Sequence, residues 1–342
     1  MNKYKDIEIA HIKKEEYAKL YNESIDNNEE FWSKVSKRIH WFKNWDNISS
    51  IDYSKAKIKW FENGKLNVSY NCIDRHIENG HGDNIALIWE GNDTSEDKQF
   101  TYKELLNEVS KFSNVLKSNN VIKGDRVCIY MQMIPELAIA MLACSRIGAV
   151  HSIVFGAFSS ESLRDRINDS KCKVVVTQDT GVRGLKKDIP MKENVDKAVL
   201  ECPSIHKVFV VKRTSTNIKM KLNRDVWWHD EMLDISSICK PEWMDSEDPL
   251  FILYTSGSTG SPKGVLHTTG GYLVYASYTH EIVFDYQSND IYWCTADIGW
   301  ITGHSYIIYG PLSNRATTLM FEGVPNYPDF SRFWQIIDKH KV

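Results

Sequence analysis

The sequence contains little of what marks fibrous, nucleic-acid-binding or membrane-spanning proteins. Glycine and proline are scarce, at 18 and 9 of 342 residues, which excludes a collagen-like or low-complexity chain. The 42 basic and 45 acidic residues give a formal net charge of −3, so there is no basic excess for nucleic acid. The longest apolar stretch, residues 134–158, is interrupted by Glu136 and Arg146, and no membrane partner is expected.

Cysteine is also sparse, and its spacing excludes two common roles. The seven cysteines are odd in number and never form a CxxC pair, so neither a disulfide framework nor a zinc site fits. The N-terminus, MNKYKDIEIAHIKKEEY, is too charged to hold the apolar core of a signal peptide. We therefore expect a reducing compartment, with the cytoplasm preferred and the nucleus or an organelle matrix left open.

Apolar and aromatic residues, in contrast, are plentiful. With 42% hydrophobic residues the chain can bury a sizeable core, either as one large α/β unit or as two or three domains. Near the N-terminus, apolar residues recur at the spacing of one helical face, at Phe31, Val35, Ile39 and Phe42. This spacing predicts an amphipathic helix that packs across a larger body.

From about residue 100 the pattern alternates between helical segments and short β-rich runs. Thr101 and Glu104 have the spacing of a capping box, and Pro135 and Gly148 bracket a second helix. A third helix is expected over 159–169. The β-rich runs are DRVCIYMQM, VHSIVF, KVVVTQ, VFVVKR and LFILYT. The alternation predicts an α/β fold of mostly parallel sheets with helices on both faces, preceded by a helical N-terminal extension, with binding residues at strand ends.

A glycine-rich loop directly follows the run LFILYT. In YTSGSTGSPKG, hydroxyl side chains alternate with glycines and a lysine closes the run, at Thr255, Ser256, Gly257, Ser258, Thr259, Gly260 and Lys263. Glycines let backbone N–H groups approach phosphate, hydroxyls donate to its oxygens and lysine neutralises its charge. The string is not the GxxxxGK[ST] P-loop, because position 262 is proline and the GK[ST] helix entry is missing. It predicts phosphate binding rather than a flexible linker.

The loop resembles that of the AMP-forming adenylate-forming enzymes, which include acyl-CoA synthetases, luciferases and peptide-synthetase adenylation domains. Three further stretches resemble the acetyl-CoA synthetase branch of this family: GVRGLKKDIPMKENVDKAV, DIGWITGHSYIIYGPL and TTLMFEGVPNYPD. The lead FWSKVSKRIHWFKNW and the string NCIDRH resemble the N-terminal extension of that branch. The resemblance covers nearly the whole chain and implies the N-terminal domain of an adenylate-forming enzyme.

The resemblance also implies roles for individual residues. The glycine-rich loop, with Lys263 as its charge-stabilising residue, would bind the triphosphate of ATP. The segment Arg183, Gly184, Leu185 and Lys186 would receive the phosphorylated end of CoA, and Lys186 keeps the charge but not the planar fork of an arginine that some members have there. Thr302 and Asn326 match positions near the path of the CoA thiol. The acetate pocket is implied to include Trp300, Ile301 and Thr302.

The reaction implied is that of an acetate–CoA ligase. Acetate attacks ATP to give acetyl-adenylate and pyrophosphate, and the CoA thiol then displaces AMP to give acetyl-CoA. Mg²⁺ would bridge the phosphates, with ligands mostly beyond residue 342, so no metal ligand is assigned in this chain. The partners are the small molecules acetate, ATP and CoA. A propionate– or other short-chain acyl–CoA ligase and a non-catalytic nucleotide-binding fragment remain as alternatives.

The resemblance further implies a division of the chain. Residues 1–75 correspond to the N-terminal extension, and residues 76–342 to an AMP-binding domain without its C-terminal end. The YGxTE-like and TGD-like motifs and the small C-terminal domain with the adenylation lysine are missing, so we expect the N-terminal part of a longer enzyme. His304 needs no role as a catalytic base, because a carboxylate attacks without one. His76 and His81 are expected to be structural.

Overall fold

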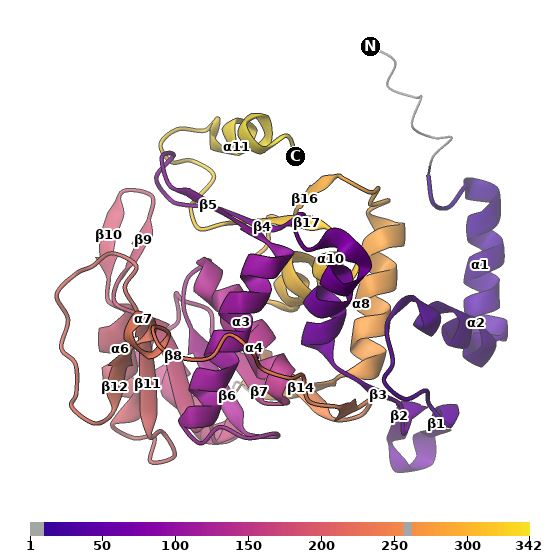
Figure 1. Ribbon diagram of the computed structural model, residues 1–342, viewed down its shortest axis with the longest axis horizontal. Helices are drawn as coiled ribbons and strands as arrows, with labels where there is room; N and C mark the ends of the chain where they lie inside the picture. The colour runs from indigo at the N-terminus through magenta and orange to yellow at the C-terminus, as the bar shows by residue number, and fades with distance from the viewer. Residues whose placement is uncertain (1–9, 256–261) are drawn as a thin grey trace.

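The computed structural model describes residues 10–255 and 262–342, which are built around two sheets (Figure 1). Within these ranges the larger sheet has seven strands in the order β12-β11-β8-β6-β7-β14-β15. Its neighbours are parallel except β14 and β15, which are antiparallel. The strands are β6 (Arg126–Tyr130), β7 (Val150–Ile153), β8 (Val174–Gln178), β11 (Lys207–Val211), β12 (Asp225–Trp227), β14 (Pro249–Thr255) and β15 (Lys263–Thr268).

The smaller sheet has the order β16-β17-β4-β5 among the described residues. Its neighbours are parallel except β4 and β5. Three short antiparallel pairs complete the strands. The remaining strands are β4 (Ile85–Glu90), β5 (Asp97–Thr101), β16 (Ile291–Trp293) and β17 (Thr317–Phe321), with the pairs β1 (Asn47–Asp52) and β2 (Lys57–Glu62), β9 (Gly181–Arg183) and β10 (Lys186–Ile189), and β3 (Lys65–Leu66) and β13 (Met244–Asp245).

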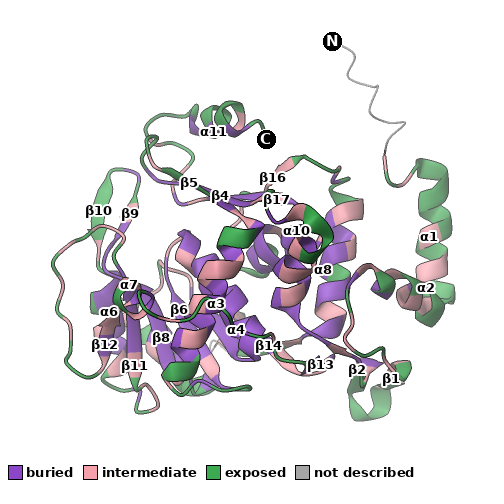
Figure 2. Cartoon of the chain, in the orientation of Figure 1, coloured by how far each residue is buried: buried purple, intermediate pink, exposed green. Residues whose placement is uncertain are grey.

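Helices cover both faces of the larger sheet, as the sequence predicts. Side chains alternate along each strand, so Val127 and Ile129 join one core whereas Cys128 and Tyr130 join another. The first core is shared with α3 (Tyr102–Ser118) and α4 (Pro135–Ile147), and the second with α5 (Ser160–Ser170) and α6 (Met191–Val199). Strands buried on both faces are typical of parallel sheets, and Figure 2 shows the central strands β6, β7 and β8 as mostly buried.

The smaller sheet is covered in the same way. Ile88 and Leu319 pack against α11 (Arg332–His340), whereas Leu87 and Met320 belong to the core that includes residues of α8 (Gly270–Val283) and α10 (Gly310–Ser313). Shorter helices are α7 (Trp228–Glu231) and α9 (Ile301–Gly303), and π-helical turns span Tyr70–Asp74, Ile77–His81 and His304–Tyr309. None of the helices in the described ranges is both long and apolar enough to cross a bilayer.

The helix boundaries follow the capping signals closely. Thr101 caps α3 in a complete capping box with Glu104, and Ser159 caps α5. Pro135 occupies the first turn of α4, and Gly148 ends that helix in the left-handed conformation, with φ of 72°. These predictions are confirmed.

The predicted N-terminal amphipathic helix is wrong in its length. Helix α2 (Asn28–Val35) ends four residues before Ile39, which has extended backbone. Beyond a short 3₁₀ turn, the backbone of His40 bonds to the Asn71 side chain, whose Oδ1 accepts at 2.7 Å and whose Nδ2 donates at 2.9 Å. Tertiary hydrogen bonds therefore replace the helical ones. The preceding helix α1 (Lys14–Asp26) has no buried residue (Figure 2).

Candidate functional site

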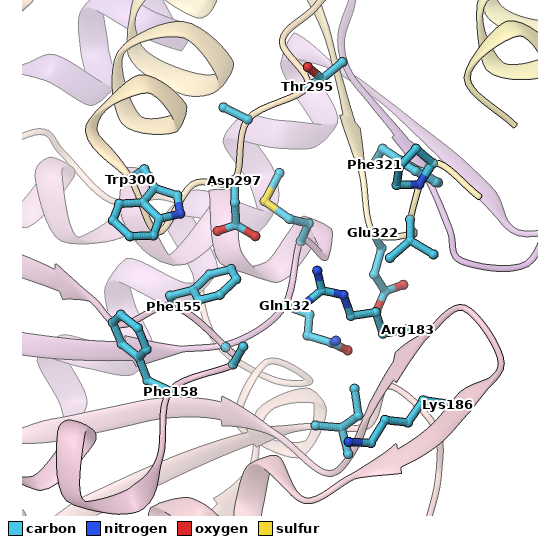
Figure 3. Close-up of a pocket in the computed structure, with 18 of the residues that line it drawn as sticks. Gln132, Phe155, Phe158, Arg183, Lys186, Thr295, Asp297, Trp300, Phe321 and Glu322 are labelled. Atoms are coloured by element: carbon cyan, nitrogen blue, oxygen red, sulfur yellow. The ribbon is translucent and has the colours of Figure 1, made fainter. Parts of the chain in front are cut away.

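A cavity of about 790 Å³ lies where strands of both sheets end. Its walls come from the segments that follow the carboxyl ends of β6 and β7 in the larger sheet and of β16 and β17 in the smaller one. The β9–β10 hairpin closes one side (Figure 3). Ligands of α/β proteins bind at the carboxyl ends of parallel strands, so this cavity is the candidate site.

The cavity brings together four of the residues singled out in the sequence: Arg183, Lys186, Trp300 and Thr302. Figure 3 shows the two cations on the hairpin and Trp300 on the opposite wall. The remaining candidates with described positions do not line the cavity; they are Gly184, Leu185, Thr255, Lys263, Ile301 and Asn326. Residues Ser256 to Gly260 of the glycine-rich loop lie outside the described residues.

The β9–β10 hairpin turns sharply at Gly184, which is why two cations can flank it. Gly184 has φ of 59°, and a Cβ there would approach Val324 to 3.2 Å. The Asn92 side chain holds the turn through two hydrogen bonds. It accepts from the Gly184 N–H at 2.6 Å and donates to the Gly184 carbonyl at 3.1 Å. Asn92 is 92 residues away in the chain, so no local pattern in the sequence identifies it.

Gln132 fixes the base of the same hairpin. Its side chain accepts from the backbone N–H of Val182 at 2.8 Å and donates to the Val182 carbonyl at 3.0 Å. Its own backbone N–H donates to the Gln178 side chain at 2.8 Å, at the end of β8. Arg183 is therefore carried by a strand that is tied to the ends of β6 and β8, although sequence reasoning did not select Gln132.

Asp297 faces the cavity from the segment after β16 (Figure 3). Burial raises the pKa of this carboxyl, while the Gly299 N–H, which donates at 2.7 Å, and the positive charge of Arg183 oppose the rise. Trp300, which is 53% exposed, supplies a flat wall three residues later, with its ring 6.1 Å from that of Phe155. The site thus combines flat apolar walls with separated charges.

Glu322 and Arg213 form an ion cluster at the edge of the cavity. The Arg213 Nε donates to Glu322 at 2.9 and 3.0 Å, and its Nη1 donates to Glu96 at 3.0 Å. Burial raises the pKa of Glu322 to about 7, against the opposing effect of Arg213. Arg213 follows β11 of the larger sheet, whereas Glu322 and Glu96 flank strands of the smaller sheet, so the cluster joins the two sheets.

The strand that precedes the glycine-rich loop is linked to the wall of the cavity. Thr255 and Lys263 are paired partners of β14 and β15, and Lys263 is exposed. The Arg166 guanidinium lies 5.5 Å from the ring centroid of Tyr254 and 4.6 Å from that of Phe158, which lines the cavity. The end of β14 is therefore connected through Arg166 to a cavity residue.

The histidines singled out in the sequence are buried or paired. His304 is fully buried against Phe251, at 4.6 Å between ring centroids, and burial lowers its pKa to about 4. The His76 Nε2 lies 2.8 Å from the Leu312 carbonyl, and His81 contacts Arg315. Their interpretation as structural residues stays a prediction.

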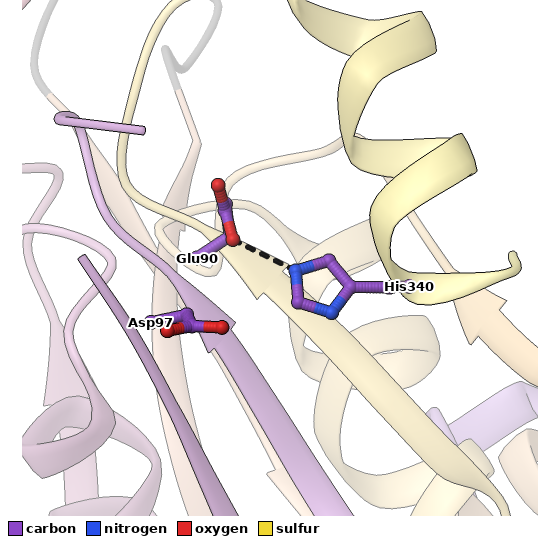
Figure 4. A group of neighbouring side chains, drawn as sticks. All are labelled: Glu90, Asp97 and His340. Carbon is purple, nitrogen blue, oxygen red and sulfur yellow. Dashed lines mark hydrogen bonds and ion pairs between the residues drawn. The ribbon is translucent and has the colours of Figure 1, made fainter. Parts of the chain in front are cut away.

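Three potential metal ligands come together in the part of the chain that the structure describes: Glu90, Asp97 and His340 (Figure 4). Glu90 is buried and already accepts from Arg332 at 2.8 Å, from Lys339 at 2.9 Å and from His340 at 2.7 Å. Two permanent cations on one carboxylate leave little attraction for a metal ion. The cluster instead fastens α11 to β4.

Comparison with known proteins places these features in context. The profile described as AMP-binding enzyme matches residues 74–342, and the profile described as acetyl-coenzyme A synthetase N-terminus matches residues 17–72. An acetyl-coenzyme A synthetase of Magnetococcus marinus is 61% identical over 334 residues, which is 97% of this chain and 52% of that protein. Acetyl-coenzyme A synthetase 2 of Pseudomonas aeruginosa is 59% identical, with the same coverage. The chain spans about half the length of the curated relatives it matches.

Proposed function

The chain belongs to the AMP-binding enzyme family, and from this we propose that it is part of an acetate–CoA ligase. The observation that carries the proposal is the cavity between the two sheets, where Arg183 and Lys186 face the wall formed by Trp300 and Thr302. Cations at one end suit the phosphates of CoA, and a flat wall at the other suits a small acyl group. The relatives named acetyl-coenzyme A synthetase support this assignment.

In the proposed reaction, an acetate carboxylate oxygen attacks the α-phosphorus of ATP, and pyrophosphate leaves with the electron pair of the broken bond. The thiol of CoA then attacks the carbonyl carbon of acetyl-adenylate, AMP leaves, and the thiol proton passes to solvent. Thr255 to Gly260 and Lys263 are proposed to bind the triphosphate, because hydroxyls, backbone N–H groups and one lysine suit its oxygens. Mg²⁺ is proposed to supply further neutralisation of the phosphates.

Acetate is the proposed acid, with Trp300, Ile301 and Thr302 in its pocket. A pocket that excludes one methylene discriminates by about 1–3 kcal/mol, so chain length is a sensitive test. Initial rates with acetate, propionate and butyrate would support acetate if kcat/KM falls at least tenfold for each added carbon. A higher value with propionate would favour the other short-chain ligase.

The two matched ranges support a proposed division near residue 75 into an N-terminal extension and an AMP-binding domain. Asn326 and the Arg183–Lys186 segment are proposed to guide CoA.

A reducing compartment, with the cytoplasm preferred, is proposed because the described cysteines are all free. The mass of the native protein in its own cells separates two alternatives. A mass clearly above the 39.5 kDa of this chain would favour a longer ligase, and a mass near 39.5 kDa would favour a short nucleotide-binding protein.

Two substitutions separate the proposed half-reactions. Lys263→Ala should lower acetate-dependent ATP–pyrophosphate exchange at least tenfold, because the triphosphate loses a neutralising charge. Arg183→Ala should raise the KM for CoA severalfold and leave exchange within about twofold of the unmodified enzyme. Both are measured on the protein as it occurs in its own cells. Unchanged exchange in Lys263→Ala, or a selective loss of exchange in Arg183→Ala, would contradict the assignments.

A further inference from the structure

A second cavity, of about 450 Å³, lies away from the candidate site, between the N-terminal segment and helices α8 and α10. Three arginines from three parts of the chain line it. Arg38 comes from the 3₁₀ turn after α2, Arg75 follows the first π-helical turn, and Arg315 lies just beyond α10. Guanidinium groups that converge on one cavity are the usual recognition elements for phosphate-class anions.

The positive charge of this cavity is only partly balanced. Arg38 forms an ion pair with Glu281 at 2.6 Å. Arg75 donates to backbone carbonyls, including that of Arg38 at 2.8 Å, and Arg315 contacts the ring of His81. Among the described residues, no carboxylate lies within 4 Å of Arg75 or Arg315. Three guanidinium groups against one lining carboxylate leave an excess of two positive charges.

The positive charge of the arginines also acts on the neighbouring His76. This ring is buried beside the cavity, and its pKa is lowered to about 3, first by burial and then by the positive charges of Arg75 and Arg315. The two arginines therefore add positive charge at this ring, and an anion in the cavity would offset it.

Arg315 lies in the turn that follows α10. Its φ is 58°, in the left-handed region, immediately after α10. Glycine or asparagine ordinarily ends a helix in this way, because a larger side chain is disfavoured there. Lys171 after α5 and Lys341 after α11 adopt the same conformation, so the backbone of Arg315 is not by itself a sign of a binding site. The turn places the Arg315 guanidinium on the wall of the cavity.

We propose that this cavity binds a phosphate dianion, either inorganic phosphate or the phosphate group of a small monoester. The excess of two positive charges matches the charge of the dianion, and guanidinium N–H groups match its oxygens. Since the arginines come from the N-terminal segment, the π-helical region and the end of α10, the bound ion joins these three parts. Phosphate therefore stabilises the N-terminal segment on the rest of the protein.

The test is phosphate binding to the whole protein, measured by calorimetry and by thermal unfolding at constant ionic strength, with chloride as the reference ion. Arg315→Gln should weaken phosphate binding at least tenfold and abolish the phosphate-dependent rise in melting temperature. Arg164→Gln, which changes an arginine paired with Asp165 and Glu201 on the surface, should leave both unchanged. Equal phosphate binding in Arg315→Gln and the unmodified protein, or no binding in either, would overturn the proposal.

A further variant separates this cavity from the candidate site. Lys186→Gln removes a cation from the larger cavity and should leave intact the phosphate binding that depends on Arg315. If Lys186→Gln abolishes binding while Arg315→Gln does not, phosphate occupies the larger cavity and the proposal is wrong, whatever the outcome for the ligase activity. Glycerol 2-phosphate in the same assay identifies the source, since binding that matches inorganic phosphate indicates room for a monoester, and binding of inorganic phosphate alone indicates the free ion.

Discussion

At the scale of single residues, the most informative group is the shared guanidinium of Arg213. Glu322 and Glu96 both bind it, so two carboxylates compete for one positive charge. Glu322 is the buried member, and its raised pKa follows from desolvation that one shared cation does not offset. A carboxyl with a pKa of about 7 at the edge of a cavity changes its charge near neutral pH.

Glu322→Gln should therefore change how stability depends on pH. The native protein holds a proton on Glu322 up to about pH 7, whereas the unfolded chain releases it near pH 4.5, so this group's contribution to stability is lost as the pH rises between these values. The stability of Glu322→Gln relative to the unmodified protein should rise by on the order of 1–3 kcal/mol from pH 5 to pH 8. Urea unfolding of both proteins at several pH values measures this difference in the free energy of unfolding.

Glu193→Gln is the matched control, because Glu193 is an exposed acid paired with Lys197. Its effect on stability should be nearly the same at pH 5 and pH 8. A pH-independent effect of Glu322→Gln would show that Glu322 stays ionised throughout this range.

The sequence identified some residues of the candidate site and missed others for a physical reason. Arg183, Lys186, Trp300 and Thr302 stand in distinctive local strings, and the cavity brings them together. The residues that hold the site in shape have no such strings, because their partners are far away in the chain. They are Asn92, Gln132 and Arg213; Glu322 does lie in the string TTLMFEGVPNYPD, but nothing in that string indicates its pairing with Arg213. Burial and long-range pairing arise only when the sheets assemble.

At the scale of elements, the capping signals in the sequence predicted a helix end correctly where its hydrogen bonds join residues close together in the chain. Helix α3 begins where Thr101 and Glu104 satisfy each other's backbone N–H groups. The predicted N-terminal helix failed beyond Val35, because Asn71 satisfies the backbone of His40 from another part of the chain. The apolar spacing over residues 31–42 is real, but hydrogen bonds from a distant side chain decided the conformation.

Thr101→Ala should destabilise the protein by about 1 kcal/mol, since one N-terminal N–H group of α3 loses its acceptor. Chemical denaturation of the protein measures this change in the free energy of unfolding. Thr101→Ser keeps the hydroxyl and should remain within a few tenths of a kcal/mol of the unmodified protein. Equal losses in both variants would assign the effect to packing of the threonine methyl group.

At the scale of the whole molecule, buried neutral histidines make the fold sensitive to acid. Burial lowers the pKa of His76 and His280 to about 3 and that of His304 to about 4. The unfolded chain protonates these rings below about pH 6.5, while the native protein does not, so this contribution to stability is lost as the pH falls. His76 and His280 both contact residues at the end of α10, whereas His304 packs against Phe251, so protonation would disturb two parts of the core.

His280→Gln should reduce the number of protons taken up on unfolding near pH 5 by about one. The slope of unfolding free energy against pH gives this number. His206→Gln, at an exposed ring, serves as the control for the substitution itself. If the slope is unchanged in His280→Gln, the ring is already charged in the native protein.

The position of the candidate cavity has a mechanical consequence. Its walls belong to two separate sheets, which share one hydrophobic core beneath it. The Arg213 ion cluster joins the two sheets at one edge, and the Trp89 Nε1, which donates to the Met133 carbonyl at 2.9 Å, joins them again. A molecule that contacts both walls would connect the two sheets. Occupancy of the cavity should therefore reduce the internal motion of the whole protein.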